Sequence, residues 1–555
     1  SEGMEHYAYL ESLFRQENIP ISAQFLDLNR QLQTKSSPES SDHQPAWNIR
    51  TSMLAPFVGR KKILEDLQRA YQGGGGIVVV GEPGLGKTRL IQEFAARAQP
   101  RPRVLLTTCR TGESALPYQP LIDLLRESIS DEEWLKIPLT WSSQVSLLLP
   151  ELEQILEKPG SSKIALDPDT APAAARSRLM EAIRQIFFIL GKDRNLLFCL
   201  DDAHWADEAT LAAVAYLLER PPFDKGLVVI MARHEEHNPA LERLFNQLQR
   251  GRQSRLIRLP YFSHSEIAEL VAHVTGTNLD QAHLNQLAQS TGGNPLYLLE
   301  TLRAIHDNLS SYLSQEEMHL PVTLSMRTLI SSRLQELSPV AFEALQTAAV
   351  VGAEFTPEVV AESSQRSIPE MIVALEELEE CQLIGQLPRV SREIRYRFIH
   401  STIREVLLLE INPLRRQWLE RHIAFSMEKH LVPEDYSQAA ILAQHFESGG
   451  EGNRAFEYWV RAGQYARQLF SLFEADAAFA HAAGLIPYLS GMPEAQVYDL
   501  FSEWAEMAFE AEDAVTIQQL SDRLRQLGEE NHNKLFLGTA LNLLCSICLM
   551  QNKYE

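Results

Sequence analysis

Residues 81–88, GEPGLGKT, have the composition and spacing of a loop that holds phosphate groups. Gly81, Gly86, Lys87 and Thr88 fit the pattern G-x-x-x-x-G-K-[ST]. Glycines let backbone N–H groups converge on phosphate oxygens, because no Cβ stands in the way. In such a loop the lysine reaches the β- and γ-phosphates and the Thr hydroxyl binds Mg²⁺. We predict an ATP/ADP site with Mg²⁺, to which the same segment contributes Gly84, Leu85 and Arg89.

Two adjacent carboxylates, Asp201 and Asp202, end the apolar run LLFCLDD at residues 196–202. Behind a strand, such a pair is typical of the metal side of a P-loop site. We predict that Asp201 holds Mg²⁺ through water and that Asp202 orients or deprotonates the attacking water. Alone, the two acids could equally cap a helix, and the phosphate-binding loop is what favours the catalytic interpretation.

Arg233 closes another apolar run, LVVIMAR, at residues 227–233. A cation at that position could contact the γ-phosphate of a bound nucleotide. A solvated arginine at a strand end explains the same pattern, and both interpretations stay open.

These residues need a scaffold, and the alternation of elements along residues 57–260 predicts one. Short apolar runs alternate with helical segments, and the alternation indicates a parallel sheet with helices on both faces. The predicted strands are IVVV, RVLLTT, LLFCLDD, LVVIMAR and RLIRLP. The phosphate-binding loop then lies between the first strand and a helix that begins near Leu90.

The remainder of the chain is predicted to be mainly helical. Residues 263–320 carry helical patterns, broken at Gly292, Gly293 and Pro295. Residues 323–410 read as several helices followed by two short strands and a further helix, an order that suits a winged helix. Its candidate recognition helix carries four glutamates at 376–380, which would repel DNA phosphate, so we expect a structural or regulatory winged helix.

From about residue 436 onward only amphipathic helices are predicted. Ala475, Phe479, Ala482 and Pro487 keep the spacing of the second helix of a tetratricopeptide repeat. The segment GEGNRAFEYWVRAG resembles part of a neighbouring repeat. A TPR-like helical array is the expected architecture.

Composition limits the classes of partner. The formal net charge of the 555 residues is −22, which disfavours a large nucleic-acid footprint or an anionic membrane surface. The five cysteines are expected to be reduced thiols, and we expect a cytoplasmic protein without a membrane segment or signal peptide. Cys545 and Cys548 form a C-x-x-C pair, which we interpret as two small apolar residues on a buried helix face rather than a redox or zinc site.

The order of these pieces resembles the STAND class of P-loop NTPases, the signal-transduction ATPases with numerous domains. It is most similar to large bacterial transcriptional regulators of the SARP and MalT/LuxR type. The resemblance covers nearly the whole chain and rests on FVGRKKIL (57–64), GEPGLGKTRL (81–90), LLFCLDDAHWAD (196–207), GGNPLYLLE (292–300) and RFIHSTIREVL (397–407). Residues 1–33 look like the end of a helical bacterial transcriptional activator domain, whose DNA-binding domain is not in this sequence.

The resemblance also implies roles for particular residues. Val58 and Gly59 would lie beside adenine, Arg60 near the nucleotide, and Pro295 against the base. His400 resembles the winged-helix histidine that touches the β-phosphate of ADP and holds a closed state, although a core histidine would look the same in sequence. Asp202 stands where many relatives carry a catalytic Glu, which favours slow hydrolysis.

The expected fold is an α/β P-loop NTPase core followed by a helical lid, a winged helix and an all-α TPR-like array. The expected domains are a remnant at 1–33, a linker at 34–50, a nucleotide-binding domain at 51–262, a lid at 263–322, a winged helix at 323–410 and a helical sensor at 411–555. The expected function is an ATP/ADP switch in transcriptional regulation that binds an unidentified inducer or protein at the array. It would self-associate with ATP and reach DNA only through an absent domain. Alternatives are a steadily hydrolysing ATPase module, and a scaffold in which nucleotide is only structural.

Overall fold

The structure is a computed structural model of the 555-residue chain. It describes residues 56–156, 172–222, 225–233, 238–250, 254–276, 279–305, 334, 337–387, 394–431, 436–489, 491, 494–511 and 513–550. The predictions of an activator-domain remnant at 1–33 and a linker at 34–50 lie outside the described residues.

A five-stranded parallel sheet forms the core, in the order β2-β3-β4-β1-β5. The predicted parallel sheet is confirmed, and each predicted apolar run overlaps one of its strands. The strands are β1 (Gly76–Val80), β2 (Arg103–Thr108), β3 (Leu196–Asp201), β4 (Gly226–Ala232) and β5 (Ser254–Arg258). β1, β3 and β4 are buried along their whole length, which explains their continuous apolar sequences. β3 ends one residue earlier than the predicted run, so Asp202 lies beyond the strand.

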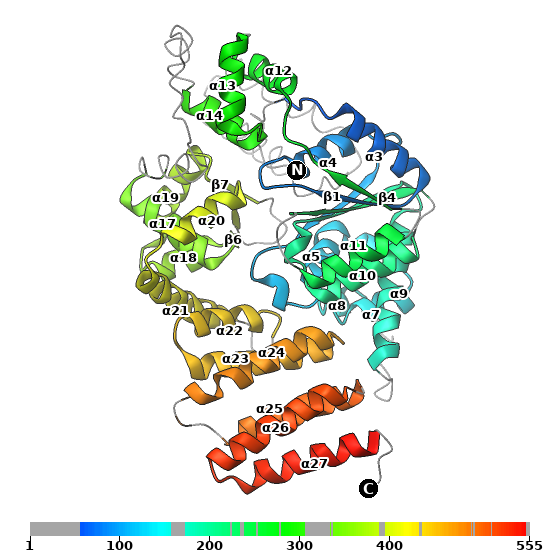
Figure 1. The fold of residues 1–555 in the computed structure, drawn as a ribbon, viewed down its shortest axis with the longest axis vertical. Coiled ribbons are helices and arrows are strands. Elements are labelled where there is room, and N and C mark those ends of the chain that lie inside the picture. Colours follow the sequence, from blue (N-terminus) through cyan, green and yellow to red (C-terminus); the bar gives the residue numbers. More distant parts are fainter. Residues whose placement is uncertain are drawn as a thin grey trace, which may run out of the picture. The chain divides into compact units, whose positions relative to one another are not determined.

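Helices cover both faces of this sheet (Figure 1). α3 (Lys61–Gly73) and α4 (Lys87–Arg97) lie on one face, and α3 contacts β1 and β4. The other face packs on α5 (Gln119–Ser128), α9 (Pro172–Leu190), α10 (Glu208–Glu219) and α11 (Pro239–Arg250). Shorter helices accompany them: η1 (Glu113–Ala115), α6 (Asp131–Trp134), α7 (Leu139–Val145), α8 (Leu152–Leu156) and η2 (Ala203–Trp205).

After β5 the chain forms two smaller units. α12 (His264–Thr275), α13 (Gln281–Thr291) and α14 (Pro295–Ile305) share one apolar cluster, which also includes Val58. A second cluster joins α17 (Pro339–Val351), α18 (Pro357–Ser363), α19 (Ile368–Glu380) and α20 (Ser401–Glu410) with a three-stranded antiparallel sheet. Its strands are β6 (Glu354–Phe355), β8 (Tyr396–Phe398) and β7 (Ile384–Gln386), and β6 was not among the predicted strands.

The C-terminal part of the described chain is helical, and the expected helical repeat region is confirmed. Its elements are α21 (Pro413–His430), α22 (Ala439–Ser448), α23 (Gly452–Gln468), α24 (Leu472–Leu485), η4 (Ile486–Tyr488), α25 (Glu494–Glu510), α26 (Ala514–Glu530) and α27 (Lys534–Met550). Neighbouring helices in sequence pack side by side (Figure 1). Phe479 of α24 lies directly against Gly463 of α23, so the missing side chain lets the two helices approach. None of the described helices is long and apolar enough to span a membrane.

The prediction that Cys545 and Cys548 lie on a buried helix face is wrong. Both thiols are exposed on α27, and none of the five cysteines, all of which the structure describes, forms a disulfide bond. α27 buries Phe536, Ala540 and Ile547, which follow one another at helical spacing. The two cysteines fall off that stripe, on the side where no described helix covers α27. The apolar character of the segment was read correctly, but which side of the helix is covered depends on its neighbours.

The close contact between Gly463 and Phe479 gives a test of the array. A methyl group at Gly463 would overlap the Phe479 ring, so we expect Gly463→Ala to destabilise the array by about 1–3 kcal/mol through overpacking. Gly538→Ala on α27 is the matched control, because a Cβ there meets nothing within 4 Å and should stabilise by about 0.5–1 kcal/mol. Urea unfolding followed by circular dichroism compares the two. An equal response of both variants would contradict the packing described for α23 and α24.

Candidate nucleotide-binding site

The order of the strands places the predicted site residues at one edge of the sheet. β4 lies between β1 and β3, and all three strands are parallel. The loops that follow them therefore leave the sheet at the same edge. These loops carry the 81–88 segment, the Asp201–Asp202 pair and Arg233. The structure thus brings together residues that lie up to about 150 positions apart in sequence, as the sites of open parallel sheets require.

The loop after β1 has the backbone that a phosphate cradle needs. Gly84 and Gly86 both adopt positive φ angles, 80° and 79°, and Gly86 directly precedes α4. The N-terminus of α4 therefore opens onto the loop, with Lys87 as its first residue. The Lys87 Nζ donates hydrogen bonds to the carbonyl oxygens of Gly81 at 2.9 Å and Glu82 at 3.2 Å. The carbonyl oxygens of the loop itself therefore hold the Lys87 ammonium group over the loop.

The predicted metal ligands are in direct contact. The Thr88 hydroxyl donates to Asp201 Oδ2 at 2.5 Å, and the Asp202 N–H donates to Asp201 Oδ1 at 2.9 Å. Burial raises the pKa of Asp201 above its ordinary value, and the Thr88 hydrogen bond opposes that shift. A hydroxyl and a carboxylate are hard oxygen ligands of the kind that Mg²⁺ uses, so this pair fits the ion.

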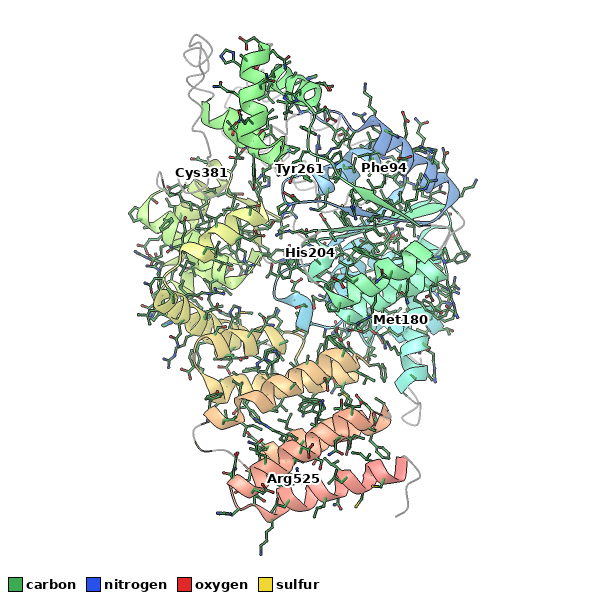
Figure 2. The ribbon with its side chains drawn as sticks, viewed as in Figure 1. Phe94, Met180, His204, Tyr261, Cys381 and Arg525 are labelled. Carbon is green, nitrogen blue, oxygen red and sulfur yellow. The ribbon has the colours of Figure 1, made fainter. Side chains whose placement is uncertain are left out.

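Asp202 leaves the strand in a left-handed conformation, with φ 48°, and begins η2. Its Oδ1 lies 4.0 Å from Nδ1 of His204, a residue that sequence reasoning overlooked. The Arg233 N–H donates to that Nδ1 at 3.4 Å, so the ring nitrogen acts as an acceptor. Burial, reinforced by Arg233 and Lys87, lowers the pKa of His204 to about 3. His204, labelled in Figure 2, is therefore neutral at physiological pH and ties the loop after β3 to the end of β4.

The Arg233 side chain reaches α20. Its Nη2 donates to Glu405 Oε1 at 2.7 Å and to the Ser401 hydroxyl at 3.2 Å. His400 immediately precedes Ser401 and is half-buried at the N-terminus of α20. Arg233 thus contacts the residue next to His400, and contact of either side chain with nucleotide stays a prediction.

A cation from the unit of α17 to α20 acts on the metal side of the site. Arg397 on β8 is close enough to Asp201 for its charge to lower the pKa of that carboxyl. Burial lowers the pKa of Arg397 itself. Sequence reasoning did not single out Arg397, although it begins the quoted motif RFIHSTIREVL.

The unit of α12 to α14 is joined to the 81–88 loop by a residue that was also overlooked. Asn294 Nδ2 donates to the Pro83 carbonyl at 2.9 Å, and its Oδ1 accepts from the Leu296 N–H at 3.0 Å. A Cβ on Gly84 would approach this Oδ1 to 2.7 Å, so only glycine fits there. Pro295 is buried as the first residue of α14. Asn294 stands inside the quoted motif GGNPLYLLE, and only the fold shows that it contacts the loop.

Arg60 provides the observation that bears most directly on a ligand. Its guanidinium lies 5.3 Å from the centre of the Phe262 ring, and its Nη1 lies 3.7 Å from where a Cβ on Gly86 would stand. The residue is only 8% exposed, and burial lowers its pKa to about 10 against the attraction of Glu266. Within the described part of the chain, its Nε and Nη2 have no hydrogen-bond partner. Buried donors of a cation without acceptors beside a phosphate-type loop fit an anionic ligand.

The remaining predicted residues lie around Arg60 and the 81–88 loop. Val58 is buried in the cluster of α12 to α14, and Gly59 lies against the Glu266 carboxylate. Leu85 is buried under the loop, while Arg89 is half-exposed and lies 3.6 Å from Glu93. The structure therefore places Val58 and Gly59 beside the unit of α12 to α14, and leaves Arg89 half-exposed on α4.

Comparisons with known proteins agree with this geometry. Residues 56–230 match the family described as the AAA ATPase domain, a range that holds β1 to β3, most of β4, the 81–88 loop and the Asp201–Asp202 pair. This part of the chain is an AAA-type ATPase module. No curated protein sequence matches the chain.

Several solved structures are similar to the chain. A STAND protein with a tetratricopeptide repeat sensor from Pyrococcus horikoshii is 15% identical, with a TM-score of 0.43 over 94% of this chain and 69% of that one. Cdc6p from Pyrobaculum aerophilum is 16% identical, with a TM-score of 0.30 over 67% of this chain and 98% of that one. A RuvB variant from Thermotoga maritima is 14% identical, with a TM-score of 0.27 over 64% of this chain and 97% of that one.

Asn294 offers a test of the contact between the 81–88 loop and the start of α14. Asn294→Ala leaves the Pro83 carbonyl and the Leu296 N–H without their partner, at a cost of about 1–3 kcal/mol. We expect a lower urea midpoint and weaker ATP binding. The control, Asn285→Ala, removes an exposed amide of α13 and should change stability by less than about 0.5 kcal/mol. If both variants unfold at the parent's midpoint, Asn294 does not join α14 to the loop.

Proposed function

We propose that this chain is an ATP/ADP-dependent switch of the STAND class, closed with ADP and self-associating with ATP. The observation that supports nucleotide binding best is Arg60, a buried cation with unmatched donors beside Gly86. The left-handed glycines and the position of Lys87 support the same conclusion from the other side of the loop. A phosphate chain would supply the acceptors that Arg60 lacks and the charge that Lys87 and the α4 N-terminus favour.

The residues at the sheet edge would have different roles in such a site. Bound Mg²⁺ would supply stabilisation of charge on the phosphate oxygens. Thr88 and Asp201 would hold the ion, and Asp202 would orient a water molecule. His204 cannot serve as a proton donor near neutral pH, because its pKa is about 3, and it fixes the backbone of Arg233 instead. The short side chain of Asp202 favours slow hydrolysis, as a switch requires.

Contacts between the core and the unit of α17 to α20 support a closed state. Arg233 pairs with Glu405, and Arg110, which follows β2, pairs with Glu354 of β6 at 2.5 Å. Arg395 also lies 3.4 Å from Glu354, so one carboxylate is shared by arginines of both units. In the proposed cycle, a γ-phosphate competes with Glu405 for Arg233, and His400 contacts the β-phosphate of ADP. A ligand shifts such an equilibrium only by its different affinity for the two states.

The proposal also includes an assignment of domains and of the biological output. We propose a nucleotide-binding domain at 51–262, a lid at 263–322, a winged helix at 323–410 and a TPR-like sensor at 411–555. The order α17, β6, α18, α19, β7, β8 supports the winged helix. The output would be transcriptional regulation of the SARP or MalT/LuxR type in the cytoplasm, triggered by an inducer at the array.

Lys87→Ala tests nucleotide binding. Removing the ammonium group from the loop should lower the affinity for MgATP and MgADP by roughly 10- to 150-fold, the worth of one or two hydrogen bonds to a charged group. Lys192→Ala removes a lysine that lies over Phe188 on α9 and should bind as the parent does. Isothermal titration calorimetry on folded proteins measures both. Parent-like affinity of Lys87→Ala would remove the phosphate-binding role of the 81–88 loop.

Glu405→Gln tests the switch. Losing the charge partner of Arg233 should weaken the closed state by about 1 kcal/mol, a modest value because the Glu405 side chain is 44% exposed. ADP should then dissociate about five times faster, and light scattering should show more self-association with ATP. Glu380→Gln, at the exposed end of α19, should match the parent. Unchanged ADP release and unchanged mass would argue for the steadily hydrolysing or scaffold alternatives.

A further inference from the structure

The helical array docks on the AAA-type module through two small surfaces. Leu469, which follows α23, belongs to the apolar cluster of the core, and Leu116, which follows η1, belongs to the cluster of the array. α24 also contacts η1 and the start of α10. The N-terminus of α10 lies a few residues beyond Asp201 and η2, so the array touches the segment that carries the metal side of the site.

Two carboxyl groups meet at that helix terminus. Asp207 is the N-cap of α10, and its Oδ1 accepts from the N–H groups of Thr210 at 2.7 Å and Tyr118 at 2.9 Å. Glu474 reaches the same terminus from α24, and its Oε1 accepts from the N–H groups of Glu208 at 2.7 Å and Ala209 at 3.2 Å. The Ser471 hydroxyl donates to the other oxygen of Glu474. Docking of the array therefore completes the cap of a core helix.

The pair is buried without a cation to balance it. Asp207 is 1% exposed and Glu474 is 4% exposed. No Lys, Arg or His among the described residues forms an ion pair with either carboxyl, and Asp207 Oδ2 has no hydrogen-bond partner there. A helix N-terminus offers about half of one positive charge, which cannot neutralise two carboxylates. Two close carboxyls in such a place hold one proton between them, because both cannot ionise.

We propose that docking of the array on the core is proton-linked: Asp207 and Glu474 share one proton when the array is docked, and loss of that proton releases the array. The ligand of this site is a proton, and the inference does not depend on nucleotide binding. In the docked state one carboxyl is protonated, and the α10 N-terminus stabilises the single negative charge that remains. When the array leaves, both carboxyls are hydrated and ionise in the ordinary way, so release sets one proton free to solvent.

The direction of the pH dependence follows from the two carboxyls. Burial, and then the charge of Glu474, raise the pKa of Asp207 to about 7, and burial likewise raises the pKa of Glu474. A carboxyl whose pKa is raised in the docked state contributes its stabilisation fully below its ordinary pKa, near about 4. That contribution declines as the pH rises and is lost as the pH passes about 7. We therefore expect the array to bind the core tightly in mildly acidic solution and weakly in mildly basic solution.

Other titratable groups face this pair. Cys109 at the end of β2 and Tyr118 have pKa values raised by burial and stay neutral across the range. Arg176 on α9 faces Tyr118, and Glu208 pairs with Arg243 at 2.9 Å on the exposed side. Glu113 on η1 is the one that needs a control, because burial raises its pKa to about 7 as well.

Hydrogen–deuterium exchange of the full chain tests the proposal. The amides of Glu208 and Ala209 are capped by Glu474 only when the array is docked. We expect the protection factor of residues 206–212 to fall by up to about tenfold per pH unit between about pH 4 and pH 7, the slope of a one-proton equilibrium, and to level off above about pH 7. Intrinsic exchange rates are divided out, and ionic strength is held constant.

The Glu474→Gln variant tests whether ionisation of this carboxyl causes the pH dependence of protection. The glutamine oxygen can still accept the two N–H groups while carrying no charge, so residues 206–212 should stay protected with at least a tenfold smaller change across the same pH range. Asp207→Asn should behave alike, whereas Glu113→Gln and Asp499→Asn, an exposed site on α25, should keep the parent's dependence.

Three results would overturn the proposal. The first is a parent protein whose protection does not change with pH. The second is a Glu474→Gln variant with the parent's slope. The third is a folded Glu474→Gln variant whose array is undocked at every pH, because the neutral side chain imitates the protonated carboxyl.

Discussion

The hydrogen bond between Thr88 and Asp201 is the contact on which the rest of the site depends. It joins the first turn of α4 to the end of β3 across 113 positions of sequence. The bond forms because β1, β4 and β3 are neighbouring parallel strands, which brings the loops after all three strands to one edge. Lys87 over the loop, Asp202 beyond the strand and Arg233 at the end of β4 take their positions from the same arrangement.

Burial of charge at this edge links the core to the units around it. Lys87, Arg233 and Arg60 are all less than a tenth exposed, and each is held by groups from a different part of the chain. Carbonyls of the loop hold Lys87, α20 supplies Glu405 to Arg233, and α12 supplies Glu266 beside Arg60. A buried cation without compensation is costly, so any ligand that brings negative charge changes the balance among these units. The same reasoning applies, with opposite sign, to Asp207 and Glu474 under the helical array.

The sequence predicted what local pattern determines. The strands were readable from continuous apolar runs, and the loop at 81–88 from glycine spacing and one lysine. Partners supplied by tertiary contacts were not readable: Asn294 on Pro83, Glu405 on Arg233 and Glu474 on α10 each depend on a second element with no fixed spacing from the first. The prediction that Cys545 and Cys548 are buried was wrong for the same reason. Helical periodicity identifies an apolar stripe, but it does not show which side of the helix its neighbours cover. His204 stood inside a recognised motif, and only its burial reveals that it is a neutral acceptor.

The central claim is that the edge formed by β1, β3 and β4 holds a nucleotide. The most direct measurement is to purify the chain, denature it, and identify by chromatography what is released into the supernatant. The account predicts ADP or ATP in near-equal amount to the protein, either retained through purification or taken up when added with Mg²⁺ and then freed of excess. A supernatant without nucleotide, from a folded protein that also fails to take up added ADP and ATP, would contradict it.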